Sequence, residues 1–307
     1  MLRTFRISLA CCLLISFASM ASASKVSPSN TTHRAAMLGG VTALYGSTSG
    51  STGTQGGGGP SNFYSVDPGT GAGTLIGAIG FDDVGAMAFH PVSHKIYAAG
   101  KRSGDKTPVL ITIDPVTGAG TEVGPIGPGR GISDVAFRPS DNTLYAHRIN
   151  CPNLIYTIDV ATGAGTVVGD VMTDQCLGGD ALEFSSANTL YLAASYNGGG
   201  GPYTLYTVDQ SSGATTPFVS LTYPASFGGL ARANAMKFDP ATGVLVCTVT
   251  TSLGGGGPYF LATIDIATGV VTEIGPTVAD LDGLVFTSDL PTRAAPTSWG
   301  RVKWLFR

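Results

Sequence analysis

Acidic and amide side chains recur at one position of a repeated pattern in this 307-residue chain. The position lies four residues before a repeated Phe and is occupied in successive copies by Gly85, Ser133, Asp180, Asn234 and Asp282, with Asp134 one residue later in its copy. Such oxygen-bearing groups could hold a polar ligand, and they suit Ca²⁺ as well. In the alternative, the Asp and Asn side chains bond turn backbone or water.

Three of these carboxylates, Asp134, Asp180 and Asp282, are also the candidates for catalysis. Glycoside hydrolysis needs two carboxyl groups about 5–9.5 Å apart, so their separation decides between catalysis and binding. The sequence contains neither a G-x-S-x-G nor an H-E-x-x-H motif. We therefore expect a binding protein rather than an enzyme, with a carbohydrate-active enzyme as the alternative.

Aromatic residues lie in or beside the loops expected on the same face as these polar groups, and rings there could stack on sugars. The predicted ligand-binding set combines both kinds of residue and consists of Asp180, Asn234, Asp282, Tyr196, Tyr203, Tyr223 and Phe227. A carbohydrate or a protein is the expected ligand.

Cysteine placement predicts one disulfide. Cys151 and Cys176 fall in loops on the same expected face, and an exported chain folds in an oxidising compartment. Cys247 lies in a predicted strand and is expected to be a buried free thiol. The cysteine spacings do not fit a zinc site, so Ca²⁺ is the one cofactor considered.

Two opposite charges, Glu183 and Lys237, occupy the same repeat position in neighbouring copies. Side chains at one level of adjacent inner strands face each other, so we expect an ion pair across the channel wall.

Five copies of one unit position these residues. Each copy carries an aspartate before a tight turn, as in VLITIDPVTGAGTEVG from Val109, and the aspartates are Asp67, Asp114, Asp159, Asp209 and Asp265. Every unit holds four short runs rich in Val, Ile, Leu, Tyr and Thr that turn residues bound, which is the strand signal. Four antiparallel strands per unit, repeated around an axis, predict a β-propeller.

The ends of the repeat region predict how the ring closes. Residues 41–45 match the second strand of a unit and residues 284–286 match the first. The C-terminal strand would therefore complete the first blade and protect its edge. We predict an all-β, five-bladed β-propeller with four-stranded antiparallel blades over residues 41–77 plus 281–287, 83–124, 132–169, 180–220 and 234–275.

Loop lengths differ between the two faces of this fold. Links between first and second strands, and between third and fourth strands, are short. The remaining links are long, and three of them contain G-G-G-G-P, at residues 56–60, 198–202 and 254–258. Because long loops on a rigid scaffold usually carry binding, we place the functional surface on this long-loop face.

The repeated units, with an L-Y-T-I-D-x-x-T-G hairpin and an F-x-P-x-x-x-x-L-Y link, resemble bacterial secreted propellers of the YVTN/NHL-like kind. The resemblance covers residues 41–290 and implies the propeller fold. The only tryptophans are Trp299 and Trp304, so the chain has no W-D dipeptide of a standard WD40 array. Since propellers host many functions, the resemblance implies little about activity.

Both ends of the chain differ from the repeats. Residues 1–23 combine a basic start, an apolar run and an A-x-A site, which predicts a secretory signal peptide rather than a membrane anchor. A linker over residues 24–40 would follow, and the repeat domain would occupy residues 41–290. The basic, aromatic tail at residues 291–307 suits contact with a cell surface or sorting receptor, or else packs on the propeller.

Composition narrows the function. Charged residues make up 12% and the formal net charge is -3, which argues against nucleic-acid binding. We expect an exported, non-enzymatic propeller, in the periplasm, at the cell surface or outside the cell, that binds through its long-loop face. A surface-structural protein without a small ligand is a further alternative.

Overall fold

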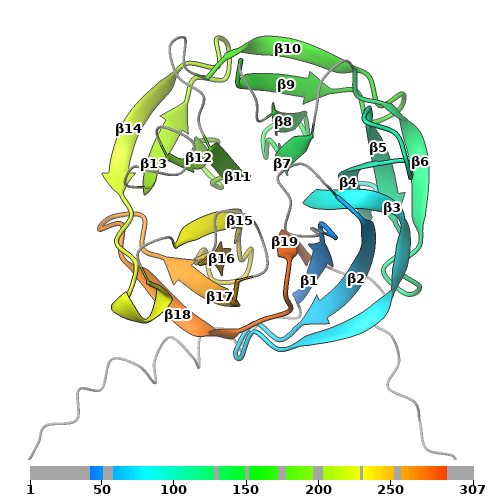
Figure 1. Cartoon of the computed structure of the whole chain (residues 1–307). Coiled ribbons are helices and arrows are strands. Elements are labelled where there is room, and N and C mark those ends of the chain that lie inside the picture. The colour runs from blue at the N-terminus through cyan, green and yellow to red at the C-terminus, as the bar shows by residue number, and fades with distance from the viewer. Residues whose placement is uncertain are drawn as a thin grey trace, which may run out of the picture.

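A computed structural model describes residues 42–50, 58–127, 131–148, 152–171, 178–195, 203–228, 231–251 and 257–288, without the side chains of residues 178–180 and 195. The described chain consists of β-strands gathered around a central axis (Figure 1). The 3-10 helix η2 (Ala225–Phe227) interrupts them. Within these ranges no helix is long and apolar enough to cross a membrane.

The largest sheet has seven antiparallel strands, and the last strand of the chain pairs in it with the first. Its order is β19 (Leu281–Thr287), β1 (Ala43–Thr48), β2 (Pro60–Val66), β3 (Gly73–His90), β4 (Lys95–Lys101), β5 (Pro108–Ile113) and β6 (Gly120–Pro125). The start of β3 pairs with β2 and its end pairs with β4. Asp82, between them, pairs with both Pro60 and Lys101, so the two units that the sequence predicted as separate are joined through β3.

Three further sheets have four antiparallel strands each. The first contains β7 (Ile132–Phe137), β8 (Leu144–Arg148), β9 (Leu154–Ile158) and β10 (Gly165–Asp170). The second contains β11 (Gly178–Phe184), β12 (Leu190–Ser195), β13 (Tyr203–Val208) and β14 (Thr215–Ser220). The third contains β15 (Arg232–Phe238), β16 (Leu245–Thr250), β17 (Tyr259–Ile264) and β18 (Val271–Pro276). In Figure 1 strands β7, β11, β15 and β19 lie near the axis, and β6, β10, β14 and β18 lie at the rim.

The repeated aspartate builds the turn between the third and fourth strands of each unit. Asp159 accepts hydrogen bonds from the Ala161 N–H at 2.8 Å and the Thr162 hydroxyl at 2.9 Å. The Gly163 N–H donates to the Asp159 carbonyl at 2.7 Å, and Gly163 has a φ of 81°, a conformation that glycine adopts without a steric penalty. The D-x-x-T-G spacing therefore encodes an Asx-type turn.

Neighbouring units touch where these turns meet the outer strands. A Cβ at Gly169 would overlap the carbonyl oxygen of Ser212 in the next unit, so glycine is required for this close approach. Equivalent contacts pair Gly77 with Thr117, Gly124 with Thr162, Ser220 with Gly269 and Gly275 with Thr70. Because Gly275 belongs to β18 and Thr70 follows β2, the contacts run from the last unit back to the first.

The core lies between the sheets. The inner strands carry a level of apolar side chains that are 0% exposed, as the sequence predicted: Met87, Val135, Leu182, Met236 and Leu284. Burying such a side chain contributes about 1.5–3 kcal/mol relative to leaving it in water. These layers give the inner strand ends a rigid support.

Candidate functional site

Two of the predicted residues, Asn234 on β15 and Asp282 on β19, meet at the inner strand ends on the long-loop face. The Asn234 Nδ2 donates to Asp282 Oδ1 at 2.6 Å. Ser49, one residue after β1, donates its hydroxyl to Asp282 Oδ2. The Asp282 carboxylate thus accepts a hydrogen bond at each oxygen, which fixes its orientation across the seam between two sheets.

Two other oxygens of this region, Asn234 Oδ1 and Asp280 Oδ1, are buried and have no hydrogen-bond partner. The Asn234 side chain cannot be reversed, because Oδ1 would then face the Asp282 carboxylate and two acceptors would repel. An unpaired buried acceptor costs about 1–3 kcal/mol. Asp280 also has a φ of 58°, a region that aspartate adopts uncommonly.

Tyr259 adds a hydroxyl to the same group. It pairs with Thr250 in the ladder between β16 and β17, and Thr250 pairs with Arg232 on β15. Burial raises the pKa of Tyr259, and the nearby carboxylates of Asp282 and Asp280 raise it further. The hydrogen bond with Thr250 and the charge of Arg232 act in the opposite direction but do not cancel the rise. These interactions define a mouth cluster that consists of Ser49, Arg232, Asn234, Thr250, Tyr259, Asp280 and Asp282.

Asp134 belongs to a different, deeper cluster and is 0% exposed. Lys237 Nζ donates to Asp134 Oδ1 at 2.9 Å and to Oδ2 at 3.0 Å. The backbone N–H groups of Val135 and Leu182 donate to the same carboxylate at 2.8 and 2.9 Å. Lys237 Nζ also lies 3.2 Å from Glu183 Oε2, which confirms the predicted ion pair. We call Asp134, Glu183 and Lys237 the buried charge cluster.

The charges of this cluster do not balance, because one lysine faces two carboxyl groups. Burial raises the pKa of Asp134 to about 6 and that of Glu183 to about 7. Burial lowers the pKa of Lys237, but the two carboxylates outweigh it and the net shift is upward. Because one lysine cannot neutralise two buried carboxylates, the acid pair of Asp134 and Glu183 retains a proton to higher pH than free carboxyl groups do.

Asp134 serves the architecture rather than the mouth. Its partners lie on its own strand β7, on β11 (Leu182) and on β15 (Lys237). Both carboxylate oxygens are occupied by protein donors and closed to solvent. Such a carboxylate links three inner strands and has no oxygen directed at a substrate.

Three predicted aromatic residues pack into the protein. Tyr203 is 5% exposed and Phe227 is 3% exposed. The Tyr203 ring meets Tyr223 edge to face at 6.3 Å, and the Phe227 ring lies 4.7 Å from Phe260. The Tyr223 hydroxyl accepts a hydrogen bond from the Ala233 N–H at 3.0 Å. Burial leaves Tyr203 and Phe227 no open face for stacking on a sugar, which corrects that expectation.

Other predicted positions are only partly described. Tyr196, Cys151 and Cys176 lie outside the described residues, so the disulfide stays a prediction, and only the backbone of Asp180 is described. Cys247 is a buried free cysteine, as predicted, and burial raises the pKa of its thiol.

The other members of the recurring position have separate surroundings. Ser133 Oγ lies 2.8 Å from Nδ1 of the buried His147, and burial lowers the pKa of that histidine to about 4. A Cβ at Gly85 would lie 3.5 Å from Asp282 Cβ, an ordinary contact, so Gly85 lies beside Asp282 across the seam.

Five residues of the mouth cluster were not predicted: Ser49, Arg232, Thr250, Tyr259 and Asp280. Each lies at or next to a strand end on the long-loop face. Their position relative to strand ends was the available signal, and it needed the exact strand register to be useful.

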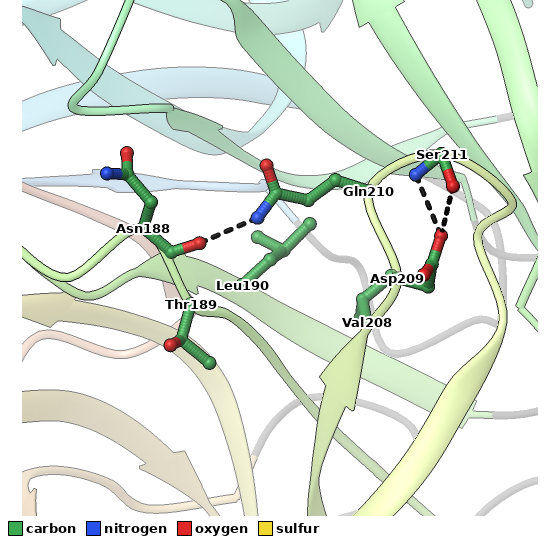
Figure 2. A pocket seen from close by; sticks show the side chains of 7 residues that line it. All are labelled: Asn188, Thr189, Leu190, Val208, Asp209, Gln210 and Ser211. Atoms are coloured by element: carbon green, nitrogen blue, oxygen red, sulfur yellow. Dashed lines mark hydrogen bonds between the residues drawn. The ribbon is translucent and has the colours of Figure 1, made fainter.

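A shallow depression lies on the opposite, short-loop face (Figure 2). It is lined by Asn188, Thr189, Leu190, Val208, Asp209, Gln210 and Ser211. Gln210 Nε2 donates to the Asn188 carbonyl at 2.6 Å, and Ser211 donates to Asp209 through its N–H and its hydroxyl. Because these polar groups satisfy one another, the mouth cluster is the stronger candidate site.

Among the described side chains, no group of three or more His, Cys, Asp and Glu is placed to hold a metal ion. The Asp180 side chain is not among them, so the Ca²⁺ option stays untested.

Comparison with known proteins supports the architecture. Residues 54–234 match a family model described as a repeat of unknown function (DUF6923). No curated protein matches the sequence. A chain in the crystal structure of a nidogen/laminin complex is 11% identical with a TM-score of 0.52, and the match covers 81% of this chain and 100% of that chain.

Two bacterial structures are less similar in shape. TolB from Acinetobacter baumannii is 16% identical with a TM-score of 0.43, over 78% of this chain and 53% of that chain. XC5397 from Xanthomonas campestris, a gluconolactonase, is 14% identical with a TM-score of 0.42, over 71% and 73%. At such identities the likeness concerns the fold alone, which is that of a β-propeller repeat protein.

Proposed function

We propose that this chain is a non-enzymatic, five-bladed β-propeller that binds a ligand at the mouth cluster. The chain belongs to the DUF6923 repeat family, whose function is unknown, so the proposal is argued from the geometry of the site. One observation carries the proposal. Asn234 Oδ1 is buried without a partner beside a carboxylate that is held in place on both of its oxygens. A ligand that donates to this oxygen would remove the cost of leaving it unpaired.

The blade count of five rests on the contacts between units. Four turn-to-strand contacts join successive units, and a fifth, between Gly275 and Thr70, joins the last unit to the first. The pairing of β19 with β1 closes the same seam near the axis. Dividing the seven-stranded sheet at Asp82 leaves two units of four strands, which together with the other three sheets make five.

The non-enzymatic reading rests on the acids. Hydrolysis of a glycoside would need a second carboxyl group within about 5–9.5 Å of the first and open to the same substrate. Asp134 is closed to solvent and held by Lys237 and two N–H groups, so it does not serve with Asp282 as such a pair. With Asp134 excluded, and with both oxygens of Asp282 engaged by Ser49 and Asn234, the geometry of these two acids favours binding over catalysis.

Export and attachment complete the proposal. The leader pattern of residues 1–23 supports export to the periplasm, cell surface or medium, where the predicted Cys151–Cys176 bond would form. The basic, aromatic residues 291–307 support contact with a cell surface or a sorting receptor. Carbohydrate or protein is the ligand class that the long-loop face would serve.

A thermal-shift screen of the full chain tests the proposal. The probes are monosaccharides and free polyols, primary amines, carboxylic acids, inorganic phosphate and CaCl₂. We expect at least one probe to raise the melting temperature of the wild type but not of Asn234→Ala. The matched control is Asp83→Gly, since Asp83 has a φ of 55° at the same face and lies outside the mouth cluster. Equal shifts in all three proteins, or none, would contradict binding at this site.

A further inference from the structure

We propose that the ligand of the mouth cluster is a polyhydroxyl compound, held through the hydroxyl groups of a sugar or another polyol. This inference rests on the proposed function and adds the chemical class of the ligand. It follows from which atoms of the cluster still need partners, from the local charge and from the state of the Asp282 carboxylate.

Two atoms of the cluster that need partners are hydrogen-bond acceptors. Asn234 Oδ1 and Asp280 Oδ1 are both buried and unpaired, and the Asn234 side chain is 6% exposed. An amide oxygen has no proton to give, and an ionised carboxylate has none either. A complementary ligand must therefore bring at least two O–H or N–H donors to neighbouring strand ends.

Local charge disfavours an anionic ligand. Asp280 and Asp282 both act on the Tyr259 phenol as negative charges, so a carboxylate or phosphate ligand would be repelled. Arg232 acts on the same phenol as a positive charge and offsets only part of this field. A neutral hydroxyl donates to the acceptors without being repelled by the carboxylates.

The hydrogen bonds that both Asp282 oxygens already accept disfavour a metal ion. Its Oδ1 accepts from Asn234 Nδ2 at 2.6 Å, and its Oδ2 accepts from the Ser49 hydroxyl. A calcium ion needs six to eight oxygen ligands, and turning Asp282 toward one would break these bonds. A hydroxyl group can donate to Asn234 Oδ1 and leave these bonds intact.

Asp280 offers a substitution that separates binding from folding. Its φ of 58° lies in the left-handed region, which glycine adopts more easily than aspartate. Asp280→Gly removes the carboxylate whose Oδ1 is buried without a partner and keeps the backbone conformation. The variant should therefore fold with an unfolding midpoint at or above that of the wild type.

The experiment measures binding of the full chain to a glycan array and, by titration calorimetry, to free monosaccharides and to glycerol. We expect glycan binding that weakens at least tenfold in Asp280→Gly and Asn234→Ala and stays within twofold of wild type in Asp83→Gly. Competition by a free monosaccharide but not by glycerol would identify the glycan as the source of the hydroxyl groups. Competition by both would still support the polyhydroxyl class.

Three results would overturn the inference. A folded Asp280→Gly variant that binds glycans as tightly as wild type would show that the ligand does not bind at the mouth cluster. Binding of an amine, phosphate or carboxylic acid that depends on Asn234, with no glycan or polyol binding, would overturn the ligand class and leave the proposed function standing. No binding of any probe by the folded wild type would overturn both.

Discussion

Replacing Lys237 with methionine should destabilise the propeller more than any substitution of an exposed charge. Lys237 Nζ donates to both oxygens of Asp134 and to the carbonyls of Val135 and Leu182, at 2.9 to 3.1 Å. Lys237→Met keeps the unbranched side chain, shortened by one atom, but leaves the buried Asp134 carboxylate without its counter-charge. Removing one partner of a buried ion pair costs about 3–5 kcal/mol.

Urea unfolding of the purified chain measures this cost. A loss of about 3–5 kcal/mol lowers the melting temperature of a domain this size by roughly 10 °C. The matched control is Arg102→Met, since Arg102 pairs with Glu122 at the surface, where a salt bridge contributes about 1 kcal/mol or less. The double variant Asp134→Asn with Lys237→Met should recover part of the loss, because it no longer buries an unpaired charge.

Two results would refute the reasoning. Unfolding of Lys237→Met at the same urea concentration as Arg102→Met would mean that the buried charge cluster contributes no net stability. Strict additivity of the Asp134→Asn and Lys237→Met effects would mean that the two side chains are not coupled.

Further predictions concern pH, close packing and the tail. The pKa of Glu183 is raised from 4.5 to about 7, so its contribution to folding stability is full below the unfolded value and is lost as the pH rises through about 7. Glu183→Gln should therefore reduce the loss of stability between pH 5 and 8 by roughly 3 kcal/mol, and an unchanged pH profile would contradict this. Gly169→Ala should lower the free energy of unfolding by about 1–3 kcal/mol through overpacking, whereas Gly131→Ala, whose Cβ would make ordinary contacts, should change it by less than about 0.5 kcal/mol. Equal effects of the two substitutions on urea unfolding would refute the packing argument. Deleting residues 291–307 should release the protein from the cell surface in a fractionation assay, and unchanged retention would count against attachment.

The repeat pattern predicted the strands because each unit contains the residues that form its own turn. The spacing of Asp159, Thr162 and Gly163 fixes an Asx-type turn locally, and four other copies repeat it. Units of the same register place equivalent residues at the same level. That is why the contacts of Glu183 with Lys237, and of Asn234 with Asp282, could be expected from the sequence.

Features that depend on register across the axis were not predictable. Asp134 contacts Lys237, which lies 103 positions later in the sequence. Their strands, β7 and β15, belong to units that do not follow each other in the chain, so the repeat pattern does not indicate this contact. The continuous path of β3 through Asp82 depends on pairing with two strands at once. Neither relation appears in the sequence of a single unit.

Side-chain burial in the long loops was equally hidden. Tyr203 and Phe227 follow no periodic pattern that shows whether a ring faces inward, and the structure packs both into the core. The unpaired oxygens of Asn234 and Asp280 are a property of the final geometry alone. The repeat pattern thus placed Asn234 and Asp282 at one level of the inner strands, but it did not show which of their oxygens lack partners.

The most direct test of binding at the mouth cluster is calorimetric titration of the strongest screening hit into wild type, Asn234→Ala and Asp83→Gly. The account predicts saturable binding of one ligand per chain to the wild type and to Asp83→Gly. It predicts an affinity at least tenfold lower in Asn234→Ala, equivalent to about 1.4 kcal/mol. Equal affinity in all three folded proteins would contradict it.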